Sequence, residues 1–517
     1  MVGNGTQGWP FDIARLVRRS VKEHGSDIAV SFEGRDQTYA ELGDRSSRVA
    51  HGLRGLGLEP GAMVAVLLSN RLEYPEVDVG LAMAGLVRVA INVRLSLDEL
   101  SYIIADSQAR VLVTEDLYDE DAAELVDRHG VHWIRMGSTK PPASARSYED
   151  LLSSSSASST MELLPDSAAA WVAYTSGTTG RPKGVVLSHR ALVSVAFNLM
   201  SEMGPIAPGQ SILLPQPLSH GAGMFAIPYL ATGSRIHIMG RFDPEEAIDL
   251  GYRERISALK CVPTMLVDML DLERPIPFES VIYGAAPIAP TEIDRALDQW
   301  GPVLMQLYGQ SEAPVTITAL HKDDHARPGP HRSSAGRPWR TVEVEILDPE
   351  GQPVGDGELG EVTVRGALVM DRYLGKPELT ADVLRDGRVW TRDMGVRDES
   401  GYIYLRGRKD EMINSGGYNI APKEVEDVVV RHPGVKECVA LGVPHKRWGQ
   451  AVEVYVVSSS DTPPTAEQIM EYCRDQLGFR RPRSVVFVDD FPRNAYGKVD
   501  RSMILAERDS RSATKDV

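Results

Sequence analysis

Short apolar runs alternate with helical patterns along the first third of the chain, and this order restricts the fold more than any other feature. Residues 64–68 (VAVLL) form a continuous apolar run, which predicts a buried strand. Residues 96–99 (SLDE) fit a helix capping box, and apolar residues follow them at helical spacing. Residues 110–114 (RVLVT) return to a strand pattern. Strand, helix and strand in this order predict a parallel sheet covered by helices, so the fold class is α/β.

The length of 517 residues indicates more than one domain. A serine-rich stretch at residues 153–160 predicts an exposed loop that joins two subdomains. A smaller set of elements stands near the end of the chain: a helix from Pro422 and strands at 452–457 and 485–488. We therefore predict a large N-terminal domain over residues 1–408, with parallel-rich sheets and covering helices, and a small α+β C-terminal domain over residues 411–517.

The composition excludes several classes of protein. The formal net charge of −16 disfavours nucleic-acid and anionic-membrane partners, because both require a basic surface.

The cysteines, Cys261, Cys438 and Cys473, are far apart and show neither a disulfide framework nor a thiolate metal spacing, which indicates a reducing compartment. No secretory signal is visible, and the most apolar run, 79–93, is too short to span a bilayer. We expect a cytoplasmic protein; a homodimer is left open.

The strongest local motif is residues 175–184 (TSGTTGRPKG), which lies between two apolar runs. Its glycines allow backbone N–H groups to turn inward, its hydroxyls add donors, and its lysine adds a positive charge, a combination that suits a polyphosphate. A flexible hairpin is the structural alternative. The spacing differs from that of a Walker loop, which disfavours P-loop enzymes. The candidate phosphate-binding residues are Thr175, Ser176, Gly177, Thr178, Thr179, Gly180 and Lys183.

This motif resembles the phosphate-loop signature of the acyl-adenylate-forming superfamily: acyl- and aryl-CoA ligases, peptide-synthetase adenylation domains and beetle luciferases. Further matches follow in the family's order, at 308–312 (YGQSE), 390–393 (WTRD), 401–410 (ending GRKD) and 492–498 (PRNAYGK). The resemblance extends from about residue 10 to about residue 505. It implies an AMP-forming ligase that uses ATP and Mg²⁺, with a small mobile C-terminal domain.

The resemblance also implies roles for single residues in binding the nucleotide. The adenine and ribose would be bound by Gly284, Ala285, Ala286, Tyr308, Gly309, Asp393 and Arg408. Ser311, where the family usually has threonine, would contact the α-phosphate. Glu312 would hold Mg²⁺, a cation that prefers carboxylate and phosphate oxygens; its structural alternative is an exposed loop carboxylate.

Two positions concern the movement of the small domain and one departs from the family. Lys498 matches the catalytic lysine, whose ammonium would stabilise the charge of the phosphorus undergoing substitution. Asp410 matches the hinge, which we place at residues 409–410; a plain surface aspartate is the alternative. The family normally has glycine where this chain has Arg392, and arginine disfavours a positive φ beside Asp393.

The resemblance implies an acyl pocket lined by four stretches: the segment after His220, residues 262–264, the turn at 284–287 and the residues after Tyr308. The resemblance implies His220, Met224, Phe225, Gly284 and Val315 as its lining, mostly small or apolar, so we expect a hydrophobic acid: aromatic, alicyclic or medium-chain. His220 is favoured as an aromatic gate over a general base, since no carboxylate orients it in the sequence. His321, His325 and His331 lie in a polar loop, for which solvation is favoured over metal binding.

The acceptor is expected to be coenzyme A, because Ser415, Gly416 and Gly417 resemble the loop that meets its pantetheine arm. Arg480, Arg481 and Arg483 are candidate contacts for its phosphates, with a solvated face as the favoured alternative. Three other functions are left open. They are an acyl-AMP ligase delivering to a carrier protein, a luciferase-like oxygenase without support in this sequence, and a catalytically silent protein that binds acyl ligand and nucleotide.

Overall fold

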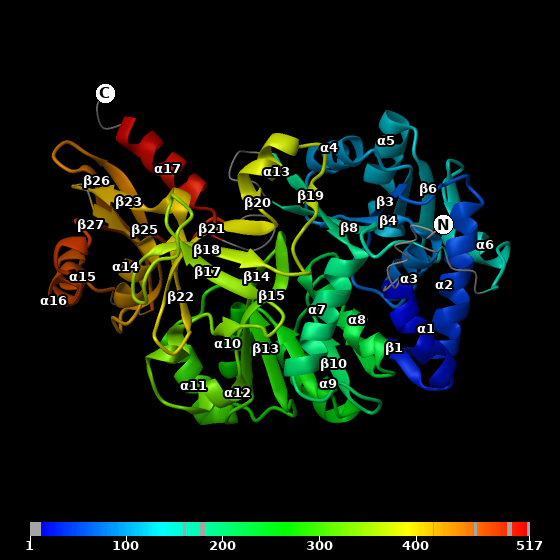
Figure 1. The fold of residues 1–517 in the computed structure, drawn as a ribbon, viewed down its shortest axis with the longest axis horizontal. Coiled ribbons are helices and arrows are strands. Elements are labelled where there is room, and N and C mark those ends of the chain that lie inside the picture. The colour runs from blue at the N-terminus through cyan, green and yellow to red at the C-terminus, as the bar shows by residue number, and fades with distance from the viewer. Residues whose placement is uncertain are drawn as a thin grey trace, which may run out of the picture.

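The computed structural model describes residues 12–158, 162, 164–175, 181–416, 418–459, 463–493 and 499–513. Within these ranges, three sheets build a large N-terminal domain and a fourth belongs to a small C-terminal domain (Figure 1). The predicted α/β class and the pairing of a large with a small domain are confirmed. None of the helices in these ranges has both the length and the apolar character needed to cross a membrane.

The first sheet contains β1 (Ile28–Phe32), β2 (Arg35–Thr38), β10 (Ser211–Leu214), β11 (Arg235–Ile238), β12 (Ala258–Cys261), β13 (Ser280–Gly284), β14 (Leu304–Gln310), β15 (Ala313–Leu320) and β16 (Arg337–Pro338). Their order in space is β16-β15-β14-β13-β12-β10-β11-β1-β2. The strands from β1 through β11, β10, β12 and β13 to β14 are parallel, whereas β2, β15 and β16 are antiparallel to their neighbours.

The second sheet contains β3 (Met63–Leu67), β4 (Val87–Ala90), β5 (Val111–Glu115), β6 (His132–Met136), β7 (Ala145–Ser147), β8 (Ala169–Thr175), β9 (Lys183–Ser188) and β19 (Arg372–Tyr373). Its order is β19-β9-β8-β4-β3-β5-β6-β7. The strands predicted at 64–68 and 110–114 are therefore confirmed as the parallel neighbours β3 and β5. The serine-rich loop connects strands of this one sheet, so the prediction that it joins two subdomains was wrong.

The helices of the large domain are α1 (Ile13–Glu23), α2 (Tyr39–Arg54), α3 (Tyr74–Ala84), α4 (Leu97–Ser107), α5 (Asp119–His129), α6 (Tyr148–Ser153), α7 (His189–Glu202), α8 (Gly221–Ala231), α9 (Pro244–Glu254), α10 (Pro263–Leu270), α11 (Pro290–Trp300), α12 (Lys322–Ala326) and α13 (Pro377–Val383). Short 3₁₀ turns occupy η1 (Asp116–Tyr118) and η2 (Pro330–Ser333). The capping box predicted at Ser96 is confirmed, because both of its hydrogen bonds are present.

The two large sheets enclose a shared layer of helices. Successive residues of a strand point to opposite faces, so Val64 packs into the central core with α1, α2, α3, α7 and α8. Its neighbour Ala65 packs outward against α4 and α5. On the other side, the outer face of the first sheet packs against α9, α10 and α11. The result is a stack of helix, sheet, helix, sheet and helix layers.

A third sheet and the small domain complete the fold. The third sheet contains β17 (Glu343–Leu347), β18 (Gly360–Arg365), β20 (Leu384–Arg385), β21 (Arg388–Arg397) and β22 (Ile403–Arg408). The small domain contains β23 (Ile413–Ser415), β24 (Tyr418–Ile420), β25 (Val435–His445), β26 (Gly449–Ser458), β27 (Ser484–Phe487), α14 (Pro422–Val429), α15 (Ala466–Tyr472), α16 (Arg474–Leu477), η4 (Gly478–Arg480) and α17 (Arg501–Ala513).

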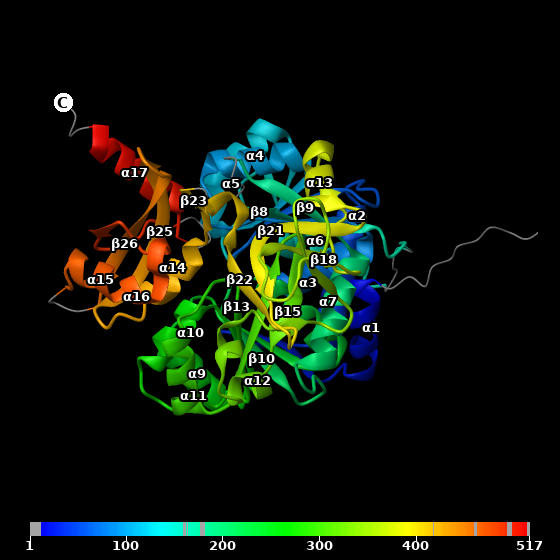
Figure 2. The ribbon, with the colours of Figure 1, turned by 60° about the vertical axis from the view of Figure 1, so that its left-hand side comes forward.

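The 3₁₀ turn η3 (Lys409–Glu411) carries the chain from β22 of the third sheet to β23 of the small domain. Helices α14 and α15 cover one face of the small sheet, and α17 covers the other. Both views show the small domain on one side of the large one, next to β22 (Figures 1 and 2).

Candidate active site

The two ends of the phosphate-loop motif are held in the second sheet. Thr175 ends β8 and Lys183 begins β9, and these residues pair across an antiparallel ladder. Ser176, Gly177, Thr178, Thr179 and Gly180 lie outside the described residues. The Lys183 ammonium lies 5.8 Å from the ring centre of Tyr373 on β19. Burial lowers the pKa of Lys183, although the neighbouring Glu312 carboxylate acts in the opposite direction.

Glu312 is oriented by a tyrosine that the sequence motifs did not include. Ser311 and Glu312 form the turn between β14 and β15, and both are half-buried. The hydroxyl of Tyr373 donates a 2.6 Å hydrogen bond to Oε1 of Glu312. Tyr373 follows Asp371 and Arg372 and precedes Leu374, a pattern that does not specify a contact with residue 312. Lys183, Tyr373 and Glu312 therefore form one polar cluster, built where β9, β19 and the β14–β15 turn meet.

A second cluster contains three of the residues assigned to the nucleotide. The Tyr308 hydroxyl donates to Oδ2 of Asp393 at 2.5 Å. Nη1 of Arg408 donates to Oδ1 of the same carboxylate at 2.9 Å. The contributing strands, β14, β21 and β22, come from two different sheets. Asp393 thus lies between an aromatic ring and a guanidinium, an arrangement able to accept hydrogen bonds from the hydroxyls of a sugar.

Arg392 has the backbone conformation that its side chain disfavours. Its φ is 62°, so the expectation that arginine would avoid a positive φ here was wrong. The neighbours compensate: the Arg392 N–H donates to Oε1 of the buried Glu361 at 2.9 Å. Its guanidinium pairs with the Asp410 carboxylate at 3.0 Å, and Lys409 pairs with the second Glu361 oxygen at 2.9 Å. Glu361 thereby connects β18 to the turn between the domains, a role that its place in the sequence did not reveal.

The candidate adenine segment follows the end of β13. Gly284 is buried, and a Cβ there would lie 2.2 Å from the Leu307 carbonyl oxygen of β14, so only glycine permits this strand spacing. The next residues, Ala285 and Ala286, are exposed, and Ala285 has a φ of 70°. Gly309 is likewise constrained, because a Cβ there would lie 2.4 Å from the backbone nitrogen of Val315.

Val315 lies in a strained position at the expected acyl pocket. Its φ is 62°, a genuine outlier for a β-branched side chain. Its Cγ2 is also the nearest atom, at 3.9 Å, to the place that a Cβ on Gly221 would occupy. The start of β15 and the start of α8 therefore face each other, and the strain is located where a ligand is expected.

His220 precedes α8 and is largely enclosed. Burial, with Arg88 and then Arg94 nearby, lowers its pKa to about 4, so the imidazole is neutral at pH 7. The buried Arg88 donates to the Leu218 carbonyl oxygen at 2.7 Å and pairs with Asp78 at 2.8 Å. Arg88 therefore fixes the loop that carries His220. It belongs to the apolar run 79–93, a pattern that does not indicate this contact.

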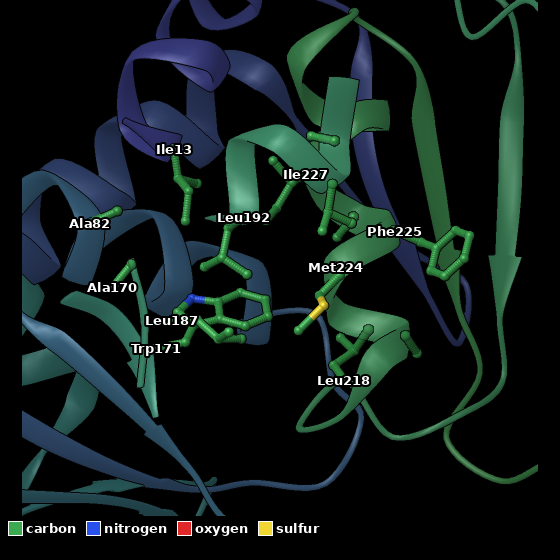
Figure 3. Close-up of a cluster of buried hydrophobic side chains, with 14 of the residues drawn as sticks. Ile13, Ala82, Ala170, Trp171, Leu187, Leu192, Leu218, Met224, Phe225 and Ile227 are labelled. Atoms are coloured by element: carbon green, nitrogen blue, oxygen red, sulfur yellow. The ribbon is translucent and has the colours of Figure 1, made fainter. Parts of the chain in front are cut away.

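Met224 and Phe225 are both buried in the central core. Figure 3 shows that they leave α8 on different sides. Met224 points toward Trp171 and Leu187, whereas Phe225 points away from them, toward the neighbouring strands. Of these two candidate pocket residues, Phe225 therefore faces the first sheet.

The candidate acceptor loop lies next to an aromatic and basic group of the small domain. The exposed Gly416 donates its N–H to the Trp448 carbonyl oxygen at 2.8 Å, and Ser415 pairs with Gly449. The Trp448 ring stacks on His445 with centroids 4.2 Å apart, and the Arg483 guanidinium lies 4.8 Å from its centre. Gly417 and Lys498 lie outside the described residues.

The remaining candidates have partners in the large and small domains. His325 is buried and lies in α12, so the prediction of a solvated loop was wrong for this residue, which contacts the Tyr283 hydroxyl at 2.9 Å. The His331 ring stacks on Tyr402. Arg480 forms an ion pair with Glu424. Among the described residues, no group of three or more histidine, cysteine, aspartate or glutamate side chains is arranged around a metal position. One carboxylate, Glu312, together with phosphate oxygens of a nucleotide, is the donor set that suits Mg²⁺.

Comparison with known proteins agrees with the motifs. The chain matches the AMP-binding enzyme family over residues 17–374 and the AMP-binding enzyme C-terminal domain over residues 424–498. It is 33% identical over 514 residues to a feruloyl-CoA synthase from Amycolatopsis sp, covering 96% of this chain and 98% of that protein. It is 33% identical over 488 residues to the fatty acid–[acyl-carrier-protein] ligase ScoC of Streptomyces coeruleorubidus, covering 92% of each.

A solved structure supports the same assignment. The amide bond synthetase McbA from Marinactinospora thermotolerans matches with a TM-score of 0.86 at 31% identity, covering 96% of this chain and 99% of that chain. The chain is therefore a member of the AMP-binding enzyme family, within the acyl-adenylate-forming superfamily that its motifs resemble.

Proposed function

We propose that the protein is an ATP-dependent carboxylic acid:CoA ligase that works in two steps. In the first step, the carboxylate of the acid attacks the α-phosphorus of ATP, which gives an acyl-adenylate and releases pyrophosphate. In the second step, the thiol of coenzyme A attacks the acyl carbon and releases AMP. These substrates belong to the cytoplasm, where we expect the protein to act.

The observation that carries this proposal is the convergence of two polar clusters from separate sheets. Lys183 and Glu312 meet through Tyr373, and Asp393 joins Arg408 and Tyr308. The first cluster supplies a cation and a carboxylate for a triphosphate and its metal, and the second supplies acceptors and donors for a ribose. A silent binding protein would need neither the aligned carboxylate nor a lysine motif at 492–498.

The residues present suit Mg²⁺, with Glu312 as its protein ligand and Tyr373 orienting that carboxylate. When bound, the metal supplies positive charge to the phosphate oxygens. Lys183 then neutralises phosphate oxygens from the β9 side, and Ser311 donates to the α-phosphate. His220, neutral because of burial, acts as an aromatic wall between the acid and the acceptor thiol. Lys498 stabilises the entering carboxylate and the charge at phosphorus.

We propose coenzyme A as the acceptor because Gly416 lies beside Trp448, with Arg483 across the ring. The exposed Gly416 has no side chain and so leaves room for a narrow pantetheine arm, and Arg483 adds positive charge for its phosphates. The feruloyl-CoA synthase relative supports this acceptor. The ScoC relative supports a second candidate, transfer to a carrier protein, and the McbA structure a third, transfer to an amine.

The test is an acid panel read by pyrophosphate release, followed by product analysis. Single-turnover mixtures of ATP, Mg²⁺ and acid should give acyl-AMP before any thioester, and adding coenzyme A should convert it to acyl-CoA. Thioester without any acyl-AMP at early times would contradict the two-step mechanism. Acyl-AMP that reacts with a carrier protein or an amine, but not with coenzyme A, would reassign the acceptor.

A further inference from the structure

A lysine is buried in the first sheet, and no carboxylate of the described residues pairs with it. Lys260 lies one residue before the end of β12 and is only 7% exposed. Its ammonium donates to the backbone oxygen of Cys261 at 2.8 Å. It also lies 5.6 Å from the ring centre of Phe225, which itself is fully buried. One carbonyl and one aromatic face leave donor capacity of this ammonium unused.

The described neighbours of Lys260 supply no negative charge. Within the described residues, no carboxylate forms an ion pair with Lys260. Burial raises the pKa of the adjacent Cys261 thiol to about 12, so that thiol is uncharged at pH 7. Burial lowers the pKa of Lys260 to about 8, which still leaves the protonated form in excess at pH 7. Burying an ammonium without an anion is costly, so a structural role alone explains this residue poorly.

The position of Lys260 connects it to the expected acyl pocket. Lys260 is paired in register with Ile282 of β13, two residues before Gly284. Residues two apart on a strand share a face, so the face that holds Lys260 continues to Gly284. Ile282, the register partner of Lys260, and Gly284 are about 7 Å apart along the strand. Phe225 approaches the same face from α8, five residues after His220 (Figure 3).

We propose that Lys260 is a specificity-determining residue, which donates a hydrogen bond to an oxygen at the end of the acid remote from the reacting carboxylate. This inference rests on the proposed acid-activating function. Ligands bind at the carboxyl ends of parallel strands, so the reacting carboxylate lies near Gly284 and the remote end of the acid reaches inward along β12 and β13. The substrate class is then a largely apolar acid, one ring or a short chain in length, that carries a distal hydroxyl or a second carboxylate.

The direct test measures binding rather than turnover. Non-hydrolysable acyl sulfamoyl-adenosines are compared in two series: benzoyl with 4-hydroxybenzoyl and 4-carboxybenzoyl, and hexanoyl with 5-carboxypentanoyl. The protein should bind an oxygen-bearing member of at least one series about 10- to 100-fold more tightly than its plain counterpart. Lys260→Met should abolish that preference and leave binding of the plain member within about threefold. Comparing the hydroxyl-bearing with the carboxylate-bearing analogues shows whether Lys260 prefers a neutral or an anionic oxygen as its hydrogen-bond partner.

Two further variants protect the comparison. Lys260→Gln keeps a donor, so it should retain part of the preference and replaces Lys260→Met if that variant does not fold. Lys322→Met is the matched control, because Lys322 also donates to a backbone oxygen, that of Glu279, but from α12. Three outcomes would overturn the proposal. Lys260→Met could weaken binding of plain and oxygen-bearing members equally, or it could leave the preference unchanged. The unmodified protein could also bind the plain member more tightly in both series.

Turnover separates this inference from the function on which it rests. If pyrophosphate is released but the preference among acids does not depend on Lys260, the role of Lys260 fails and acid activation stands. If no acid of either series releases pyrophosphate while the adenylate analogues retain a Lys260-dependent preference, acid activation fails and the role of Lys260 stands.

Discussion

Among single residues, Glu312 has the most specific expected effect. Glu312→Gln keeps the shape of the side chain and removes its charge, so adenylation should slow by about 10²-fold or more and require higher Mg²⁺. Pyrophosphate release measured across an Mg²⁺ titration tests this. Glu358→Gln is the control, because it changes an exposed carboxylate in the segment between β17 and β18. An unchanged rate with an unchanged Mg²⁺ titration would place the metal at other residues.

Tyr373 should act through Glu312 rather than by touching substrate. Tyr373→Phe removes the 2.6 Å hydrogen bond but keeps the ring beneath Lys183. We expect adenylation to slow by about 10-fold, with a raised Mg²⁺ requirement, because one hydrogen bond to a charged group stabilises by about 1.5–3 kcal/mol. Tyr404→Phe removes a comparable 3.0 Å bond to Asp398 and should leave both quantities unchanged. A lower rate without any change in Mg²⁺ requirement would contradict the positioning role.

The motifs predicted many of these residues but not the contacts that connect them. Tyr308, Asp393 and Arg408 come from three separate motifs, and the structure brings them together. Tyr373 is 61 residues from Glu312 in sequence, and Glu361 is 31 residues from Arg392. Such contacts depend on how separate sheets meet, which no local pattern encodes.

At the scale of elements, β21 stores strain next to the boundary between the domains. Arg392→Gly and Arg392→Ala both remove the ion pair with Asp410, but only glycine adopts a φ of 62° without cost. The glycine variant should therefore have a free energy of unfolding about 1 kcal/mol higher than the alanine variant. Denaturant titration of the two variants measures the difference.

The same strand offers a control with the opposite sign. Arg397 forms an ion pair with Asp356 at 3.1 Å and is not among the described residues with positive φ. Here alanine should be more stable than glycine by about 0.5–1 kcal/mol, because glycine loses more conformational freedom on folding. If alanine were equal to or better than glycine at position 392 as well, strain at that position would be excluded.

Whole elements were more predictable than their connections. The helix from Ser96 and the strands at 64–68 and 110–114 follow from capping and apolar runs, both of which are local signals. The serine-rich loop was assigned to a boundary between subdomains because composition marks exposure, not which strands a loop joins. The first sheet combines β1 with strands beyond residue 210, an arrangement set by long-range burial.

For the whole molecule, buried histidines should destabilise the fold in acid. Burial lowers the pKa of His189, His220 and His325 to about 4 and that of His237 to about 3, against 6.5 without burial. Below pH 6.5 the unfolded chain binds protons that the folded chain does not, so the free energy of unfolding decreases from pH 6.5 to 4. The pKa of Asp78, raised to about 6 by burial, opposes this trend.

One variant isolates the histidine contribution. Between pH 7 and pH 5, the free energy of unfolding of His237→Gln should decrease by about 2 kcal/mol less than that of the unmodified protein. The reason is that each pH unit below 6.5 lowers this free energy by about 1.4 kcal/mol for each such histidine. The exposed His132→Gln should follow the unmodified protein. Denaturant titrations at the two pH values measure the losses, and equal losses in all three proteins would contradict the prediction.

Variants at Lys498 and Asp410 should affect adenylation and thiolation to different degrees, because the small domain carries groups for both half-reactions. Lys498 and the loop at Gly416 cannot both face one adenylate, so we expect the domain to turn about Asp410, which Arg392 holds in the present arrangement. Lys498→Ala should slow adenylation by about 10²- to 10³-fold, the scale for losing one preorganised charge contact. It should still convert supplied acyl-AMP and coenzyme A to thioester.

Asp410→Pro fixes φ at the hinge and should preserve only the half-reaction that its trapped orientation permits. Supplying synthetic acyl-AMP to both variants measures thiolation alone. If folded Lys498→Ala lost both half-reactions equally, domain alternation would be excluded for this protein.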